Sequence, residues 1–296
     1  MIKAINLAIV TILVQIGCIT AQKYDLFYLS MGSPVYSNLG NLDAAEVGAT
    51  EMSNLFDELG AVDGLKVITD VSHPMTDKLI NKSLNGLVKL IRKSRSSNPL
   101  VIFYYAGHGF TSGLSKGLYI PPTDFDIDNT KDYDYMDWLE NTISPLQVKE
   151  FLDEQNLDYI LMFDSCQEGE LVDDQVLDSY VIDNLGLETL DTLMRQTYEI
   201  LIAYNLMVGD NPVILSCEPG NIVSTEPYNF GNGTVDTAPL CRRAHIVLKR
   251  ELVGESVSVK KFMQTLLNHE LDPSTNSLFT AWKYGEKNDK TIGIIR

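Results

Sequence analysis

The chain has 296 residues, 45% of them hydrophobic, and 23 basic against 40 acidic side chains give it a formal net charge of −17. This length and composition can bury one sizeable core, and the sequence has no repeat or low-complexity segment typical of a solenoid or a disordered protein. The negative charge without a basic stripe excludes nucleic acid as an expected partner and favours cationic substrates or divalent cations, although it is equally typical of a soluble secreted protein.

The N-terminal segment has the features of a secretory signal peptide. Lys3 precedes an apolar stretch over residues 4–19, and Thr20-Ala21-Gln22 supplies a small residue at which cleavage is expected. We therefore predict a signal peptide at 1–21, one large α/β domain at 22–296, and a secreted protein or one of the secretory pathway. The alternative is an N-terminal membrane helix, so a membrane is an expected partner only if this segment stays uncleaved.

Strand and helix patterns alternate along the rest of the chain. Strands are predicted from short apolar runs rich in Val, Ile, Phe and Tyr, at 24–30, 65–69, 100–109, 117–120, 159–166, 212–217 and 277–282. Helices are predicted from apolar residues at helical spacing and from capping signals, at 43–59, 76–94, 144–155, 188–207, 238–252 and 259–269. This alternation predicts a largely parallel sheet with right-handed crossovers and helices on both faces.

Two of the predicted strands end in a reactive side chain. The run at 100–109 ends in Gly107-His108-Gly109, and the run at 159–166 ends in Asp164-Ser165-Cys166. Because the carboxyl ends of parallel strands share one rim, an imidazole and a thiol are expected to meet there, and the imidazole can activate the thiol. Taken singly, such a cysteine is usually a small buried apolar residue and such a histidine a turn residue.

These two motifs resemble the catalytic signatures of the caspase-like cysteine peptidases, and the metacaspase branch more closely than animal caspases. The resemblance lies in residues 105–109 and 164–169 and extends diffusely over 24–282. It implies a three-layer α/β sandwich with about six mostly parallel strands and helices on both faces. The chain departs from the metacaspase pattern at Ala106, Gln167 and Glu168.

The resemblance also implies roles for the residues of the rim. Cys166 is expected to attack a peptide carbonyl, and His108 to transfer a proton to the departing amine. Backbone N–H groups of Gly109 and Cys166 are expected to hold the oxyanion. The substrate is then a peptide or protein, and the chemistry needs no cofactor.

Acidic residues are expected in the substrate pocket, because metacaspases accept Arg or Lys before the scissile bond. The matching positions are Asp164, two residues before the nucleophile, and Asp43, at the turn after the first strand. The alternative for Asp164 is a cap or turn residue after a strand, and for Asp43 it is the N-cap of the first helix.

Calcium is a ligand that many members of this branch bind beside the active site. Asp173 lies at a matching distance after the nucleophile, and Asp124 or Glu140 are further candidate ligands. Without an EF-hand spacing, solvated loop charges explain these acids equally well. An oxidising compartment favours a disulfide between Cys217 and Cys241, with Cys166 left as a thiol.

Two other functional readings stay open. The chain is either an active endopeptidase or a weak or inactive caspase-like binding protein, and the substitutions after Cys166 are the support for the second reading. Legumain and the peptidase subunit of the GPI transamidase carry related His-Gly and Cys motifs and enter the secretory pathway. The sequence does not fix the oligomeric state.

Overall fold

The computed structural model describes residues 24–111, 118–124, 142–166, 211–216, 224–254, 256–268, 282–284 and 291–294. The predicted signal peptide and the predicted helix at 188–207 lie outside these residues. Within the described part of the chain, no helix is long and apolar enough to cross a membrane.

A six-stranded sheet forms the centre of the fold, in the order β11-β7-β6-β3-β1-β2. Its strands are β1 (Asp25–Gly32), β2 (Asp63–Ile68), β3 (Pro99–Ala106), β6 (Asp158–Asp164), β7 (Val213–Leu215) and β11 (Trp282–Tyr284). The first five are parallel to their neighbours, and β11 is antiparallel to β7. The predicted sheet of about six mostly parallel strands is therefore confirmed.

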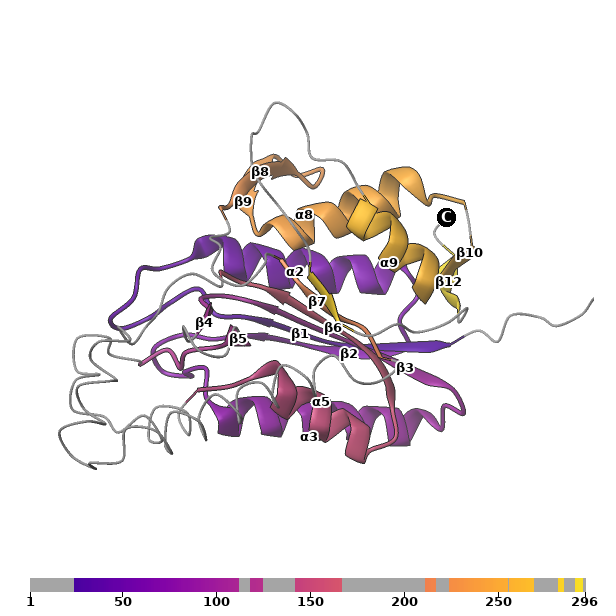
Figure 1. The fold of residues 1–296 in the computed structure, drawn as a ribbon, viewed down its shortest axis with the longest axis horizontal. Coiled ribbons are helices and arrows are strands. Elements are labelled where there is room, and N and C mark those ends of the chain that lie inside the picture. The colour runs from indigo at the N-terminus through magenta and orange to yellow at the C-terminus, as the bar shows by residue number, and fades with distance from the viewer. Residues whose placement is uncertain are drawn as a thin grey trace, which may run out of the picture.

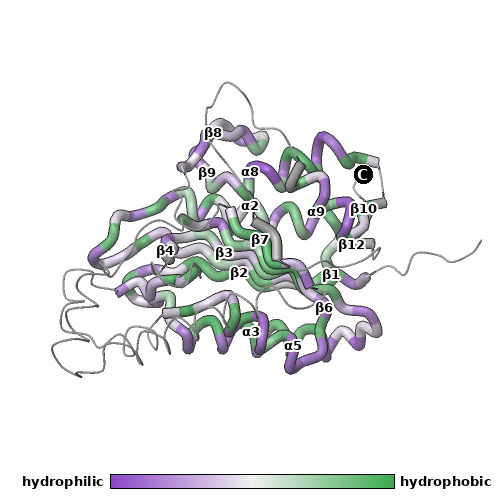
Figure 2. The backbone as a smooth tube through the Cα atoms, viewed as in Figure 1, coloured by the Kyte–Doolittle hydropathy of each residue, from purple (hydrophilic) through white to green (hydrophobic). Residues whose placement is uncertain are grey.

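Helices cover both faces of the sheet and complete a three-layer sandwich (Figure 1). One face carries α2 (Asp43–Glu58), α8 (Pro239–Ile246) and α9 (Val259–Asn268), and the other carries α3 (Asp77–Ser94) and α5 (Pro145–Glu154). Successive strand residues point to opposite faces, so each of the two layers has its own apolar core. Figure 2 shows this as apolar strands between helices whose outer faces are hydrophilic.

The two helices on the second face begin at capping residues that the sequence identifies. The side chain of Thr76 accepts the N–H of Leu79 at the start of α3. At the start of α5, Ser144 and Gln147 form a capping box with Pro145 as the first helical residue. Both helices were predicted to begin within one residue of these positions.

Local structure differs from the predictions in three places. The predicted helix at 238–252 is α8 followed by a π-helical segment, Val247–Glu251. No helix or strand was predicted between 217 and 238, where β8 (Glu226–Asn229) and β9 (Thr234–Thr237) form a hairpin. The remaining small pairs are β4 (Phe110–Thr111) with β5 (Leu118–Tyr119), and β10 (Ser256–Ser258) with β12 (Thr291–Ile294).

The order of the strands determines where a crevice forms. The chain runs from β1 outward to β2 at one edge, and then returns to place β3 on the other side of β1. The loops after β1 and β3 therefore leave the sheet in opposite directions, which opens a crevice at their carboxyl ends. The residues predicted to be catalytic follow β3 and β6, beside this point.

Candidate active site

The candidate active site lies at the carboxyl ends of β3 and β6. These strands pair in parallel, with Ala106 opposite Asp164. His108 and Cys166 each follow two residues after this pair, so both occur at the same level of neighbouring strands. The backbone N–H of Gly107 still donates to the carbonyl of Asp164, at 3.4 Å, which extends the pairing one residue into the motifs.

Gly109 brings the two motif turns into contact. A Cβ atom at this position would lie 2.7 Å from the carbonyl oxygen of Cys166 and 2.7 Å from Oγ of Ser165. Those distances are shorter than any real Cβ contact, so only glycine allows the turn after His108 to pack against the turn that carries Cys166. The structure therefore packs the turn after His108 against the turn of Cys166, and the pairing of the imidazole with the thiol stays a prediction.

The imidazole of His108 is oriented by the loop after β1. Its Nε2 lies 2.7 Å from the carbonyl oxygen of Gly40. A carbonyl oxygen can only accept a hydrogen bond, so we assign the ring proton to Nε2, which leaves the lone pair of the neutral ring on Nδ1. Gly40 was not identified from the sequence, although its loop was expected at the same rim.

Two tyrosine hydroxyls hold the peptide groups of His108. Its backbone N–H donates to Oη of Tyr36 at 2.9 Å, and its carbonyl accepts from Oη of Tyr105 at 2.9 Å. The two hydroxyl oxygens are 3.2 Å apart. Because Tyr105 uses its only proton on the His108 carbonyl, Tyr36 is the donor between them. The ring of Tyr36 also packs edge-on against the imidazole, with centroids 4.7 Å apart.

Burial lowers the pKa of His108 below its ordinary value of 6.5, and the hydrogen bond to Gly40 opposes this shift. Burial disfavours the charged imidazolium, so the ring is neutral near pH 7. A neutral ring with its lone pair on Nδ1 can accept a proton from a thiol. The arrangement is therefore suited to a general base in the resting protein.

The turn that carries Cys166 is held by β7. The hydroxyl of Ser216, the residue after β7, accepts the backbone N–H of Ser165 at 3.0 Å and donates to the Ser165 carbonyl at 2.9 Å. Ser216 is fully buried, whereas the side chain of Cys166 is half-buried and forms no disulfide. One buried serine thus holds the peptide groups on both sides of Ser165, next to a partly accessible thiol, and no motif in the sequence identifies it.

The two residues predicted for the substrate pocket lie in different surroundings. Asp164 is 3% exposed, and its carboxyl group accepts hydrogen bonds from Tyr104 and from the start of α8. Asp43 is exposed and is the first residue of α2, three residues beyond Gly40. The N-cap of α2 is Leu42, so the alternative reading of Asp43 as that N-cap is wrong. Its role in substrate binding, like that of Asp164, stays a prediction.

The predicted calcium ligands are not assembled by the described residues. Asp124 is exposed at a turn, while Asp173 and Glu140 lie outside the described part of the chain. Among the residues that are described, no three His, Cys, Asp or Glu side chains cluster as a metal site would require. The described residues by themselves do not fit calcium, and we assign it no step.

The disulfide predicted between Cys217 and Cys241 stays a prediction. Cys241 is a thiol fully buried in the first turn of α8, and burial raises its pKa well above the ordinary value. Its predicted partner, Cys217, lies outside the described residues. Cys241 packs in the apolar core of the layer that holds α2 and α8, and its backbone N–H donates to Asp164.

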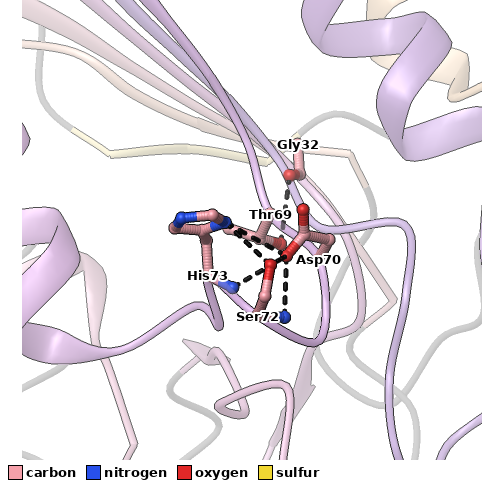
Figure 3. A network of polar contacts seen from close by, with 5 residues as sticks. All are labelled: Gly32, Thr69, Asp70, Ser72 and His73. Atoms are coloured by element: carbon pink, nitrogen blue, oxygen red, sulfur yellow. Dashed lines mark hydrogen bonds and ion pairs between the residues drawn. The ribbon is translucent and has the colours of Figure 1, made fainter.

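The end of β2 at the edge of the sheet is closed by a compact polar turn (Figure 3). Oδ1 of Asp70 accepts the N–H groups of Ser72 and His73, each at 2.7 Å. Hydrogen bonds from Ser72, together with that of the His73 N–H, lower the pKa of Asp70 to about 2. Thr69 links this turn to β1 by donating to the Gly32 carbonyl at 3.3 Å. The exposed ring of His73 also lies beside this carboxylate, with Nδ1 3.3 Å from Oδ1 of Asp70.

Comparisons with known proteins agree with this architecture. A family model described as the caspase domain of peptidase family C14 matches residues 29–277. Caspase-1 from Spodoptera frugiperda is similar in structure, with a TM-score of 0.52 and 12% identity over 92% of each chain. A structure of pro-Sf-caspase-1 reaches a TM-score of 0.48 and 10% identity, over 92% of this chain and 90% of that chain. No curated protein sequence matches the chain.

Proposed function

Because the chain belongs to the caspase-domain family of cysteine peptidases, we propose that it is an endopeptidase with Cys166 as nucleophile and His108 as general acid and base. One observation carries this proposal. His108 and Cys166 each follow two residues after a paired position on adjacent parallel strands, and Gly109 joins their turns. If the turns of His108 and Cys166 did not pack together, the residue after His108 would not need to be glycine.

The proposed mechanism begins with the neutral imidazole. Nδ1 of His108 accepts the proton of the Cys166 thiol, and the thiolate sulfur forms a bond to the carbonyl carbon of the scissile peptide. Backbone N–H groups of Cys166 and Gly109 donate to the resulting oxyanion. The C–N bond then breaks as His108 returns the proton to the departing amine. Water, deprotonated by His108, hydrolyses the thioester and restores the thiol.

We further propose that the enzyme cleaves after Arg or Lys. The net charge of −17 favours cationic peptides. Asp43 supports this preference most directly, because its side chain is exposed and follows the loop that orients His108. The carboxyl group of Asp164 is already bound by three donors of the protein itself. Peptides ending in Arg, Lys, Asn and Asp, tested with and without calcium, measure the preference, and cleavage after Asp or Asn alone contradicts it.

The catalytic roles can be tested with a peptide electrophile that alkylates thiols and carries Arg at its C-terminal position. We expect covalent labelling of the wild-type protein, none in Cys166→Ala, and labelling at least about 100-fold slower in His108→Ala. Cys241→Ala is the matched control, since it removes a buried thiol and should be labelled normally. Equal labelling of Cys166→Ala refutes the proposed nucleophile. A folded wild-type protein that is neither labelled nor active on any peptide is instead a binding protein.

A further inference from the structure

The carboxyl group of Asp164 lies inside the protein, at the last residue of β6 and two residues before Cys166. Its Oδ2 accepts the hydroxyl proton of Tyr104 at 2.9 Å and the backbone N–H of Cys241 at 2.8 Å. Its Oδ1 accepts the backbone N–H of Leu240 at 3.2 Å. The donors therefore come from the neighbouring strand β3 and from the start of α8.

The two backbone donors are groups that a helix leaves without an internal acceptor. Leu240 and Cys241 are the second and third residues of α8, whose first N–H groups point out of the helix. An N-cap side chain usually accepts them, but the N-cap of α8 is Ala238, which has no oxygen to offer. Asp164 supplies the missing acceptor, although 76 residues separate it from Leu240.

Gly48 on α2 leaves space for the third donor to Asp164, the hydroxyl of Tyr104. A Cβ atom on Gly48 would lie 2.7 Å from Oη of Tyr104 and 3.7 Å from the Cβ of Ala238. Glycine at this position therefore lets the Tyr104 hydroxyl stay between α2 and α8 while it donates to Asp164. Strand β6, strand β3, α2 and α8 meet at this carboxyl group.

We propose that Asp164 is a positioning residue, which caps α8 from β6 and so fixes the strand end that carries Cys166, and that it does not present its carboxylate to the substrate. This inference rests on the proposed function, because it assigns a role in bringing Cys166 to His108. It also separates the two acids predicted for the pocket and leaves Asp43 for the substrate.

The charge state of Asp164 is compatible with this role. Burial raises its pKa to about 7, and the N–H groups of Cys241 and Leu240 and the Tyr104 hydroxyl oppose that shift. The titratable groups around it are Tyr104 on β3, the Cys241 thiol on α8, and Glu226 on β8, which is paired with Arg242 at 2.6 Å. The ionised carboxyl group, which can accept all three hydrogen bonds, is thus present from about neutral pH upward.

The test compares Asp164→Asn and Tyr104→Phe with a matched control at the opposite end of β6. There the hydroxyl of Tyr24 donates to Asp158, the first residue of that strand, so Tyr24→Phe removes a similar tyrosine–aspartate bond far from Cys166. The substrates are two peptides that differ only in arginine or its uncharged analogue citrulline before the scissile bond. A second readout is the rate at which iodoacetamide alkylates Cys166, which needs no peptidase activity.

For Asp164→Asn we expect kcat to fall about 10- to 100-fold for both peptides, because a displaced nucleophile slows the reaction of any substrate. The preference for arginine over citrulline should change less than about twofold, whereas loss of a carboxylate that binds guanidinium would lower that preference about 5- to 150-fold. Alkylation of Cys166 should slow in the same variant. Tyr104→Phe, which keeps both backbone donors, should show a smaller effect of the same kind, and Tyr24→Phe should show none.

A collapsed preference for arginine with unchanged kcat would overturn the inference and restore Asp164 to the substrate pocket. Unchanged kcat and unchanged alkylation in both variants would overturn it as well. If the wild-type protein cleaves neither peptide, the proposed function fails, yet the alkylation rates of the Asp164 and Tyr104 variants still decide whether the two residues position Cys166.

Discussion

Replacing Tyr36 with phenylalanine tests whether the peptide groups beside His108 must be held for catalysis. The change removes one oxygen and keeps the ring that packs on the imidazole. That oxygen accepts the backbone N–H of His108 at 2.9 Å and lies 3.2 Å from the hydroxyl of Tyr105. The variant therefore leaves a buried N–H without its acceptor and removes the donor to Tyr105.

The size of the effect follows from the cost of an unsatisfied buried group. Leaving the N–H of His108 without an acceptor should lower the free energy of unfolding by about 1 to 3 kcal/mol. If the misplaced imidazole raises the reaction barrier by the same amount, kcat/KM falls about 5- to 150-fold. Since Tyr36 is not expected to touch the substrate, most of the loss should appear in kcat and little in KM.

The assay combines urea unfolding with steady-state hydrolysis of an arginine peptide across pH. Tyr159→Phe is the matched control, because its hydroxyl donates to Asp153 at 2.8 Å at the opposite end of β6. It should lose stability without loss of kcat. If Tyr36→Phe loses stability but keeps kcat within about twofold of the wild type, the hydroxyl is only structural and the positioning argument is wrong.

Three further predictions follow from single contacts. Gly109→Ala should abolish peptide hydrolysis, because the added Cβ would overlap the turn of Cys166. Gly40→Ala should stay active, because the space around Gly40 is open. Equal activities of the two variants would refute the close packing of Gly109 against Cys166. Gly48→Ala should lower kcat as Tyr104→Phe does, because the added Cβ would displace the Tyr104 hydroxyl from Asp164. Normal activity would show that α2 can shift to accommodate the Cβ. Burial lowers the pKa of His245 to about 4, below its unfolded value of about 6.5, so the unfolded chain takes up the proton first. Stability present above pH 6.5 should thus fall by about 3 kcal/mol as pH drops toward 4, and urea unfolding of His245→Gln should lack this slope.

The fold and the two reactive residues could be predicted because their signals are local. The runs that become β3 and β6 are apolar between their first and last residues, which is typical of strands buried on both faces. Parallel pairing then places their last residues at one rim, so the proximity of His108 and Cys166 follows from topology alone. The start of α5 could be predicted as well, because Ser144, Pro145 and Gln147 form its cap within a single helical turn.

The partners of these residues could not be predicted, because they depend on contacts between distant segments. Asp164 was predicted to bind substrate, with a cap or turn role at its own strand end as the alternative, and the helix whose first N–H groups it accepts begins 75 residues later in the chain. Tyr36 follows β1 and Ser216 follows β7 without a spacing pattern that marks them, and their hydroxyls make these contacts only once the sheet has formed. A buried hydroxyl that binds backbone groups leaves no periodic trace in a sequence.

Buried hydroxyl groups bind the backbone beside both proposed catalytic residues in the same way. The N–H and the carbonyl of His108 are each bound by a tyrosine hydroxyl, and the N–H and the carbonyl of Ser165 are both bound by Ser216. The two peptide groups that flank each of these residues therefore cannot rotate without breaking a hydrogen bond. In the proposed dyad, the backbone that carries the imidazole and the thiol is thus held before a peptide arrives, so less binding energy is needed to order it. It follows that Ser216→Ala should lower kcat as Tyr36→Phe does in the same peptide assay, although the two residues act at the ends of two neighbouring strands, β6 and β3.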